Sequence, residues 1–426
     1  MNAQLTPPSA AAGLDAWLSY LEALHPKEIE LGLERIKTVA QRLAVDPGAA
    51  KVITVAGTNG KGSTVRYLET VLRNGGYQTG VYISPHLVNY EERVRINGLE
   101  LEAQQHVNAF QAVERARGDT SLTYFEFGTL AAFWLMMQAP LDVWILEVGL
   151  GGRLDAVNCL AADVGIVTSV GIDHVDFLGP DRTSIAREKA GIFRADKIAI
   201  IGEADFPPAI LSELKQAGIA PLSVGEDFNY RLALDAGSWD YFGHRNVLRD
   251  LPLPHVPLPN AATAICALEQ LELPVSEQAI RQGLAQAREK GRLQFQPGKP
   301  DVLIDVAHNP HAATFLATHI KQRFSDRRVY LVIGMLKDKD IQGTLAALAD
   351  VVDDWYLADL SGARAASAQQ LASALPASVK ETDAQQFSSV KAAYQAACSA
   401  ASDDQQQALV LVCGSFYTVS QIPLAE

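Results

Sequence analysis

The chain has 426 residues, of which 48% are hydrophobic and 20% are charged, and its formal net charge is -13. This length favours two domains, and the acidic excess makes an electrostatic nucleic-acid surface unexpected. No C-x-x-C pair occurs among the four cysteines, which fits a reducing compartment better than a disulfide framework or a zinc site.

The N-terminal stretch MNAQLTPPSAAAGLDAW has no basic region followed by an apolar core, so a secretory signal is not expected. The longest apolar stretch, FGTLAAFWLMMQAPLDVWILEV, is broken by Gln138, Pro140 and Asp142. It therefore predicts a buried helix followed by a buried strand rather than a membrane span. We expect a cytoplasmic protein that binds neither a membrane nor nucleic acid.

Apolar runs of strand length alternate with helical stretches over the first part of the chain. Strands are predicted at residues 51–57, 79–84, 143–149, 163–170 and 197–202. Continuous apolar strands joined by crossover helices are typical of a parallel sheet covered on both faces. Residues 222–258, which include a proline-rich stretch and several aromatic residues, predict a small antiparallel insertion.

A polar segment with glycine and proline, EKGRLQFQPGKPD, is the best linker candidate at about residues 290–300. Four further apolar runs follow it: VLIDVAHN, RVYLVIGML, DDWYLADL and ALVLVCGSF. We therefore predict an α/β protein of two domains. Residues 1–295 form a P-loop-type parallel-sheet domain, and residues 296–426 form a smaller Rossmann-like α/β domain.

The stretch TVAGTNGKGSTV, residues 54–65, predicts a phosphate-binding loop between a strand and a helix. Backbone N–H groups at the start of a helix bind anions, and Lys61 adds a positive charge. The usual string G-x-x-x-x-G-K-[ST] is not matched, because Gly62 separates Lys61 from Ser63. A plain turn is the alternative, but a turn needs no lysine with two hydroxyls after it. A nicotinamide site is disfavoured, since GLGGRL at 149–154 matches G-x-G-x-x-G only in part.

Three side chains that suit magnesium follow the ends of predicted strands: Ser84, Glu147 and His174. Taken singly, each has an ordinary interpretation as a strand cap, a solvated carboxylate or a structural histidine. Their shared position at the carboxyl edge of a parallel sheet, on the side of the phosphate loop, favours a metal site. Asp305 and His308 in the second domain and Arg292 in the linker are either surface charges or groups placed to meet a nucleotide between the domains.

Several strings together resemble the dihydrofolate synthase/folylpolyglutamate synthase family, within the Mur-ligase-like ATP-dependent amide ligases. The resemblance runs nearly from end to end. It rests on GTNGKGS, SPHL with ERVRING, TYFEFGT, LEVGLGGRLDAVN, DHVDFLG, REKAGIF, LPNAATA, DVAHNPHA and VCGSFY.

The resemblance implies a set of site residues. Those that would bind ATP are Thr58, Asn59, Gly60, Lys61, Gly62, Ser63, Asn260, Arg292 and Asp305. Those that would hold magnesium are Ser84, Glu147 and His174, beside Lys189 as a candidate N6-carboxylysine. Those that would bind the folate are Glu30, Leu31, Gly32, Thr123, Tyr124, Phe125, Glu126, Leu154, Asp155 and Ala156.

The resemblance also implies the reaction. ATP would phosphorylate a carboxylate of dihydropteroate or of a tetrahydrofolate, and the amino group of L-glutamate would attack the acyl phosphate. Lys61 would face the transferred phosphate, and His308 and Ser415 are candidates for the glutamate or acyl-transfer step. The expected cofactors are ATP and two magnesium ions, with a monovalent cation left open, and the expected state is a monomer.

Three alternatives remain open from the sequence. A folylpolyglutamate synthase with one activity would share the ATP site, although the match at the pterin positions favours the bifunctional form. A Mur ligase of peptidoglycan synthesis would carry a complete UDP-sugar domain before the phosphate loop, where this chain has only about fifty residues. A regulatory NTPase without ligase chemistry would not need the TYFEFGT and GLGGRLDA stretches.

Overall fold

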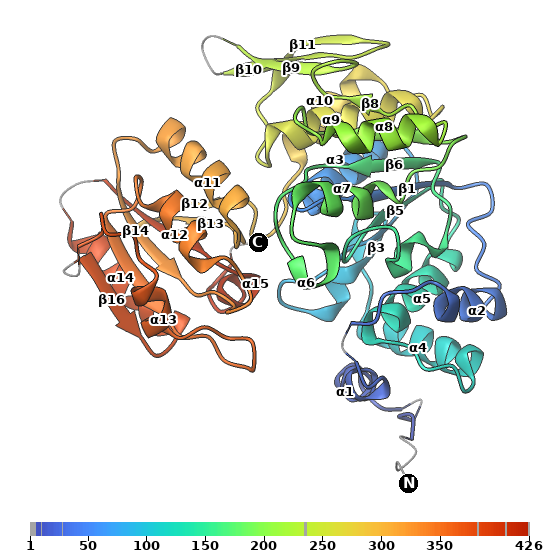
Figure 1. Ribbon diagram of the computed structural model, residues 1–426, viewed down its shortest axis with the longest axis horizontal. Helices are drawn as coiled ribbons and strands as arrows, with labels where there is room; N and C mark the ends of the chain where they lie inside the picture. Colours follow the sequence, from blue (N-terminus) through green and yellow to red (C-terminus); the bar gives the residue numbers. More distant parts are fainter. Residues whose placement is uncertain are drawn as a thin grey trace. The chain divides into compact units, whose positions relative to one another are not determined.

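The computed structural model describes residues 6–9, 11–27, 29–233, 237–380, 383–404 and 407–424. The chain divides into two compact units, Met1–Ala287 and Arg288–Glu426 (Figure 1). We call them unit 1 and unit 2. The segment proposed as a linker, residues 290–300, belongs to unit 2 and contains strand β12 (Gln294–Gln296), which pairs antiparallel with β13 (Asp301–Ile304).

Unit 1 is built on an eight-stranded sheet in the order β4-β3-β2-β5-β1-β6-β7-β8. Six neighbouring strands are parallel: β2 (Thr79–Tyr82), β5 (Val143–Glu147), β1 (Lys51–Ala56), β6 (Val164–Val167), β7 (Ile198–Ile201) and β8 (Leu222–Ser223). The predicted parallel sheet is confirmed. The short antiparallel strands β3 (Val94–Ile96) and β4 (Leu99–Glu100), which the sequence analysis did not predict, extend one edge.

The two faces of this sheet carry separate hydrophobic cores because side chains alternate along each strand. On β5, Val143 and Ile145 pack in one core, whereas Trp144 and Leu146 pack in the other. The first core includes α3 (Lys61–Asn74), α9 (Leu258–Gln270) and α10 (Glu277–Gln286). The second includes α1 (Leu14–Leu24), α2 (Glu34–Arg42), α4 (Ala103–Arg117) and α5 (Tyr124–Met137). A third cluster holds α6 (Val175–Leu178), α7 (Arg182–Ala190) and α8 (Pro208–Gln216).

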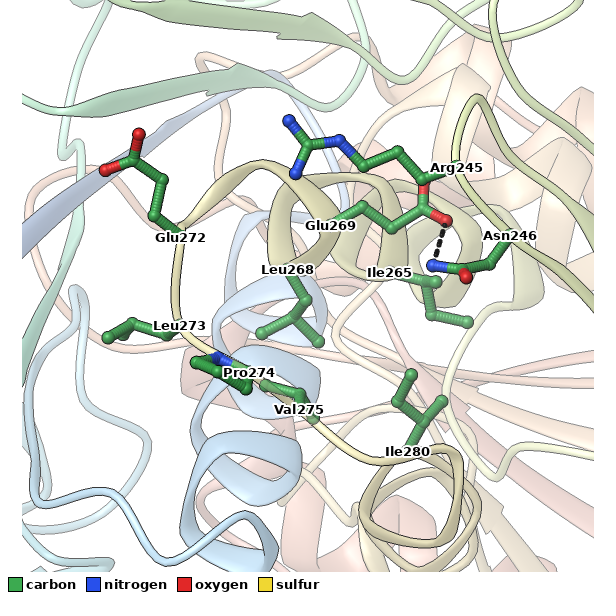
Figure 2. A pocket seen from close by; sticks show the side chains of 10 residues that line it. All are labelled: Arg245, Asn246, Ile265, Leu268, Glu269, Glu272, Leu273, Pro274, Val275 and Ile280. Carbon is green, nitrogen blue, oxygen red and sulfur yellow. Dashed lines mark hydrogen bonds between the residues drawn. The ribbon is translucent and has the colours of Figure 1, made fainter.

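The predicted antiparallel insertion is confirmed as a three-stranded sheet of β9 (Asn229–Leu232), β10 (Ser238–Phe242) and β11 (Val247–Pro252). The turn between β10 and β11 borders a hollow of about 420 Å³ whose other walls come from α9, α10 and the connection between these two helices (Figure 2). Its floor is aliphatic, and Arg245, Asn246, Glu269 and Glu272 supply its polar groups. None of the residues that line it belongs to the predicted ATP, metal or folate sets.

Unit 2 contains a six-stranded sheet in the order β12-β13-β17-β14-β15-β16. The strands β17 (Ala408–Cys413), β14 (Arg328–Ile333), β15 (Asp354–Ala358) and β16 (Ala384–Phe387) are parallel to β13, as predicted for a Rossmann-like domain. Its helices are α11 (Pro310–Arg323), α12 (Ile341–Leu348), α13 (Ala368–Ser373), α14 (Val390–Asp403) and α15 (Phe416–Val419). Across both units, none of the helices that the structure describes has the length and apolar character needed to cross a bilayer.

Candidate active site

The predicted phosphate loop lies between β1 and α3, so it leaves the carboxyl end of a central parallel strand. Helix α3 begins at Lys61, directly after Gly60, whose φ of 86° is left-handed. A Cβ atom at Gly60 would lie 2.5 Å from Oδ1 of Asn260, which leaves no room for a side chain. The loop and Asn260, two parts of the predicted ATP set, are therefore neighbours.

A second loop supports the phosphate loop from the next strand. Residues 168–171, which follow β6 and which we call the β6 loop, exchange hydrogen bonds with Thr58 and Asn59. Thr58 N–H donates to the Ser169 carbonyl at 2.8 Å, and Gly171 N–H donates to Oγ1 of Thr58 at 2.9 Å. Asn59 N–H donates to Oγ of Ser169 at 3.1 Å. The conformation of the phosphate loop thus depends on a segment more than a hundred residues away.

Two lysines lie in one electrostatic environment at this loop. Lys61 Nζ donates to the carbonyls of Gly57 at 3.0 Å and Thr58 at 3.3 Å. Lys189, in the last turn of α7, is buried, and burial together with the charge of Lys61 lowers its pKa to about 7, against the attraction of Asp173 and Asp155. A lysine in this state is a nucleophilic amine near neutral pH, which is the condition for forming a carbamate.

The three predicted metal residues follow the ends of strands that lie together in the sheet, in the order β2-β5-β1-β6. Ser84 follows β2, Glu147 ends β5, and His174 follows β6 by way of the β6 loop. Glu147 is buried, and its Oε2 would lie 3.8 Å from a Cβ atom built on Gly62, so this carboxylate faces the phosphate loop. His174 has a left-handed φ of 51° and its Nε2 lies 4.0 Å from the Asp173 carboxylate.

A divalent cation fits two of these three residues on local grounds. Oγ of Ser84 is buried and has no hydrogen-bond partner within the described ranges, which is unusual for a hydroxyl and suits a ligand atom. Glu147 supplies a hard carboxylate oxygen of the type that magnesium prefers. In the described part of the chain, no three His, Cys, Asp or Glu side chains form a cage that could hold a metal ion. The candidate set of Ser84, Glu147 and His174 contains only two residues of those four types, Glu147 and His174.

The predicted folate residues come from three separate stretches, and the structure brings parts of them together. Arg35 Nη2 donates to the Glu30 carbonyl at 2.9 Å and pairs with Glu126 at 3.2 Å, which joins residues 30–32 to the start of α5. A Cβ atom at Gly149 would lie 2.5 Å from the ring of Phe125, so that ring covers the loop that leads to Leu154 and Ala156.

Asp155 lies at the end of this same loop. It is buried, and its carboxylate accepts from Leu150 N–H at 2.8 Å and Val157 N–H at 3.0 Å. Burial raises the pKa of Asp155 to about 6 against these hydrogen bonds and the charge of Lys61. The charge of Asp155 acts on both Lys61 of the phosphate loop and Lys189 of α7, which links the predicted folate set to these two lysines. Thr123 and Glu126 cap α5, and Tyr124 lies next to them at its first position.

Four predicted residues lie in unit 2, and three of them surround Phe416. The guanidinium of Arg292 lies 5.4 Å from the centre of the Phe416 ring, and the His308 ring lies 6.3 Å from it. Ser415 caps α15 by accepting from Thr418 N–H at 3.0 Å. Asp305 is buried and accepts from Leu293 N–H at 2.9 Å and Ala307 N–H at 2.8 Å. Burial raises the pKa of Asp305, whereas the charge of Arg292 lowers it.

The sequence analysis did not single out several residues that build these sites. They are Arg35, the β6 loop and Phe416. Each acts through a partner far away in the chain, so no local motif marks it. Residues 168–170, TSV, formed the end of a predicted strand, and their hydroxyls were the one available signal.

Comparison with protein families gives two matches along the chain. A Mur ligase middle domain matches residues 55–238, and a Mur ligase glutamate ligase domain matches residues 291–416. Among characterised proteins, the dihydrofolate synthase/folylpolyglutamate synthase of Escherichia coli (strain K12) is 53% identical over 415 residues, which cover 97% of this chain and 96% of that protein. The protein of the same description from Haemophilus influenzae is 40% identical and covers 97% of each chain.

Solved structures agree with these relatives. The structure of E. coli FolC in complex with DHPP and ADP has a TM-score of 0.92 and 53% identity, and it covers 97% of each chain. A bifunctional folylpolyglutamate synthase/dihydrofolate synthase from Yersinia pestis, complexed with AMPPNP and an Mn ion, has a TM-score of 0.91, 49% identity and 98% coverage of each chain. The chain therefore belongs to the dihydrofolate synthase/folylpolyglutamate synthase family, ATP-dependent amino-acid ligases built from Mur ligase domains.

Proposed function

We propose that this chain joins L-glutamate to dihydropteroate, forming dihydrofolate, and to the γ-carboxyl group of folates, forming polyglutamates. One observation carries the proposal: the buried Glu147 carboxylate faces the phosphate loop, and the charge of Lys61 in that loop lowers the pKa of the buried Lys189. Asp155, which acts on both lysines, belongs to the stretches predicted to bind the pterin. The relatives support the substrates, because E. coli FolC has been solved with DHPP and ADP and a second relative with Mn, AMPPNP and L-glutamate.

In the proposed reaction, residues 58–63 and Asn260 hold the phosphates of ATP. Backbone N–H groups at the start of α3 point toward the anion, and Lys61 turns from the loop carbonyls to the transferred phosphate. Phosphoryl transfer depends mainly on positioning and on neutralising charge, so these groups supply most of what the first step needs. The product of that step is an acyl phosphate, which the amino group of L-glutamate attacks, releasing phosphate.

Ser84, Glu147 and His174 are proposed to hold magnesium, with Lys189 as an N6-carboxylysine beside them. Magnesium, when bound, neutralises phosphate charge and orients the reacting oxygens. Lys189 forms a carbamate by attack of its neutral amine on carbon dioxide with loss of a proton. The anionic product removes the repulsion between Lys189 and Lys61 that the free ammonium would create.

The pterin end of the substrate is proposed to contact residues 30–32, 123–126 and 154–156. The ring of Phe125 offers a stacking surface, and the carboxylates of Glu126 and Asp155 offer acceptors for the amino-pyrimidine edge. Arg35 pairs with Glu126 and holds it against residues 30–32. In this proposal the pterin is bound by unit 1.

The residues of unit 2 keep the roles that the resemblance implies. Arg292 and Asp305 are proposed to bind ATP, and His308 and Ser415 are proposed to act in the glutamate or acyl-transfer step. We further propose that two magnesium ions take part, that a monovalent cation is optional, and that the enzyme is a cytoplasmic monomer that acts on small molecules alone.

One assay tests the proposal and its alternatives. ADP release is measured with and without L-glutamate, using dihydropteroate in one series and a tetrahydrofolate in the other. We expect release that depends on glutamate with both acceptors. Release with the tetrahydrofolate alone would indicate a monofunctional folylpolyglutamate synthase. Release without any acceptor would indicate an NTPase, and the bifunctional assignment would be wrong in both cases.

A further inference from the structure

The β6 loop needs support of its own because it runs beyond the last paired residue of its strand. Backbone groups that leave a sheet and stay buried must find other partners. Val170, at the middle of this loop, is buried, and both of its backbone groups are bound by side chains. Glu203 accepts from Val170 N–H, and Arg182 Nε donates to the Val170 carbonyl at 3.0 Å.

The two side chains also bind each other. Arg182, the first residue of α7, forms an ion pair with Glu203, which lies just after β7, and its Nη1 donates to Asp205 at 2.9 Å. The planar guanidinium can reach all three partners at once because its donors point in fixed directions. Only 12% of the Glu203 side chain is exposed, so solvent does not replace its contacts with Val170 and Arg182.

Val170 lies between the two residues through which the β6 loop binds Thr58. Ser169 accepts from Thr58 N–H, and Gly171 contacts the Thr58 hydroxyl. A displacement of Val170 would therefore move both supports of Thr58 together. Neither Arg182 nor Glu203 belongs to the predicted site, and neither contacts the phosphate loop directly in any recorded hydrogen bond of the described chain.

We propose that the Arg182–Glu203 pair is a positioning clamp that sets the phosphate loop for nucleotide by gripping both backbone groups of Val170. The inference rests on the proposed role of the phosphate loop in binding ATP. The two residues act through the β6 loop and are not catalytic. An ordinary ion pair between α7 and the sheet would stabilise the fold without preferring one substrate over another.

The test is the affinity for ADP, measured by calorimetry on the full chain. Glu203→Gln removes the negative charge that holds Arg182. Arg182→Lys keeps the positive charge but loses the planar guanidinium that binds three partners at once. We expect each variant to weaken ADP binding about tenfold, the usual effect of removing a residue that orients the groups in direct contact with a ligand. In turnover assays, KM for ATP should rise while KM for dihydropteroate stays within about twofold.

The same helix offers a matched control. Arg187 of α7 pairs with Glu213 of α8 at 2.6 Å, on an exposed surface. Arg187→Lys and Glu213→Gln make the same two substitutions at this comparable ion pair, and neither should change ADP affinity. ADP affinity at the wild-type value in both clamp variants would overturn the proposal. If Glu203→Gln does not fold, Arg182→Lys alone decides between the two results.

A charge swap separates a clamp from a simple ion pair. The double variant Arg182→Glu/Glu203→Arg restores opposite charges but turns a guanidinium toward Val170 N–H and a carboxylate toward its carbonyl. We expect ADP affinity to stay low in the swapped protein, and recovery to the wild-type value would overturn the clamp. If the wild-type protein itself binds no ADP, the proposed function is wrong. That outcome differs from failure of the clamp, in which the wild type and the variants bind ADP equally well.

Discussion

Each unit buries one aspartate in the same kind of turn, but the cations beside the two aspartates differ. Asp155 in unit 1 and Asp305 in unit 2 both accept from the N–H group two residues ahead and from one earlier in the chain. Burial raises the pKa of both. The charges of Lys61 and Lys189 act on Asp155, whereas those of Arg292 and, more weakly, His308 act on Asp305.

This difference determines where the protein can respond to pH. An arginine stays protonated at any pH that a folded protein survives. Lys189, in contrast, has a pKa of about 7, so the charge around Asp155 changes near neutrality. We infer that the pH dependence set by Lys189 originates in unit 1, and variants in the two units test this division.

The largest effect is expected from removing the charge of Lys61. Lys61→Ala deletes the cation that is proposed to face the transferred phosphate while leaving the cores intact. Turnover should fall at least about a hundredfold, which corresponds to about 2.7–4 kcal/mol for one electrostatic catalytic group. Steady-state ADP release measures it, with Lys215→Ala on exposed α8 as the control. A rate near that of the wild type would contradict the phosphate-loop assignment.

The next effect concerns Lys189 as a carbamate. Lys189→Ala should lower activity about 10–100-fold, and a short-chain carboxylic acid should restore part of it by filling the vacated space. Because a neutral amine is required, activity should fall as pH drops below about 7, and added bicarbonate should oppose that fall.

Carbon-13 NMR with labelled bicarbonate reports the carbamate of Lys189 directly. Lys189→Met, which keeps most of the volume, is the control for the carbamate signal and should lose it. An active enzyme that shows only a bare amine at saturating bicarbonate would refute carboxylation and leave the ligase assignment intact.

A smaller effect is expected for Glu147→Gln, which keeps the volume and removes one charge from the proposed metal site. The magnesium concentration that gives half-maximal rate should rise about tenfold or more. Glu213→Gln, on the exposed face of α8, should leave the magnesium titration unchanged. An identical titration for Glu147→Gln would mean that this carboxylate is structural.

The finest test replaces the two aspartates in parallel. Asp155→Asn and Asp305→Asn should each lower the free energy of unfolding by about 1–3 kcal/mol, because an amide leaves one buried N–H group without its acceptor. Urea unfolding measures this loss. Only Asp155→Asn should also move the pH–rate midpoint, and to lower pH, because the charge of Asp155 raises the pKa of Lys189. Equal midpoints in both variants would contradict the division between the units.

Most of the framework could be predicted from the sequence, because buried parallel strands are continuous apolar runs. The strands that were missed are short edge strands such as β12, β16 and the β3–β4 pair. The sequence QFQ of β12 and AQQF of β16 contain no apolar run, so only pairing with a neighbouring strand makes them extended.

The candidate site was predictable to the extent that its residues occur in local strings. Lys61, Glu147 and Lys189 lie within such strings, and the structure places the first two around the phosphate loop and the third beside Lys61. The support from Arg182, Glu203 and Phe416 was not predictable, because these residues act through contacts between distant segments. The lowered pKa of Lys189 depends on burial, and burial could not be predicted for a lysine in a charged helical stretch.

The alternation along β5 has a consequence for how this gene can change. Glu147 shares its face of the sheet with Val143 and Ile145, and that face carries α3 and the phosphate loop. One residue inserted or deleted within β5 would turn the carboxylate to the opposite face, into the apolar core around Trp144. Point substitutions in this strand are therefore graded in their effect, whereas a single in-frame codon gained or lost would displace the proposed metal ligand and bury its charge in one step.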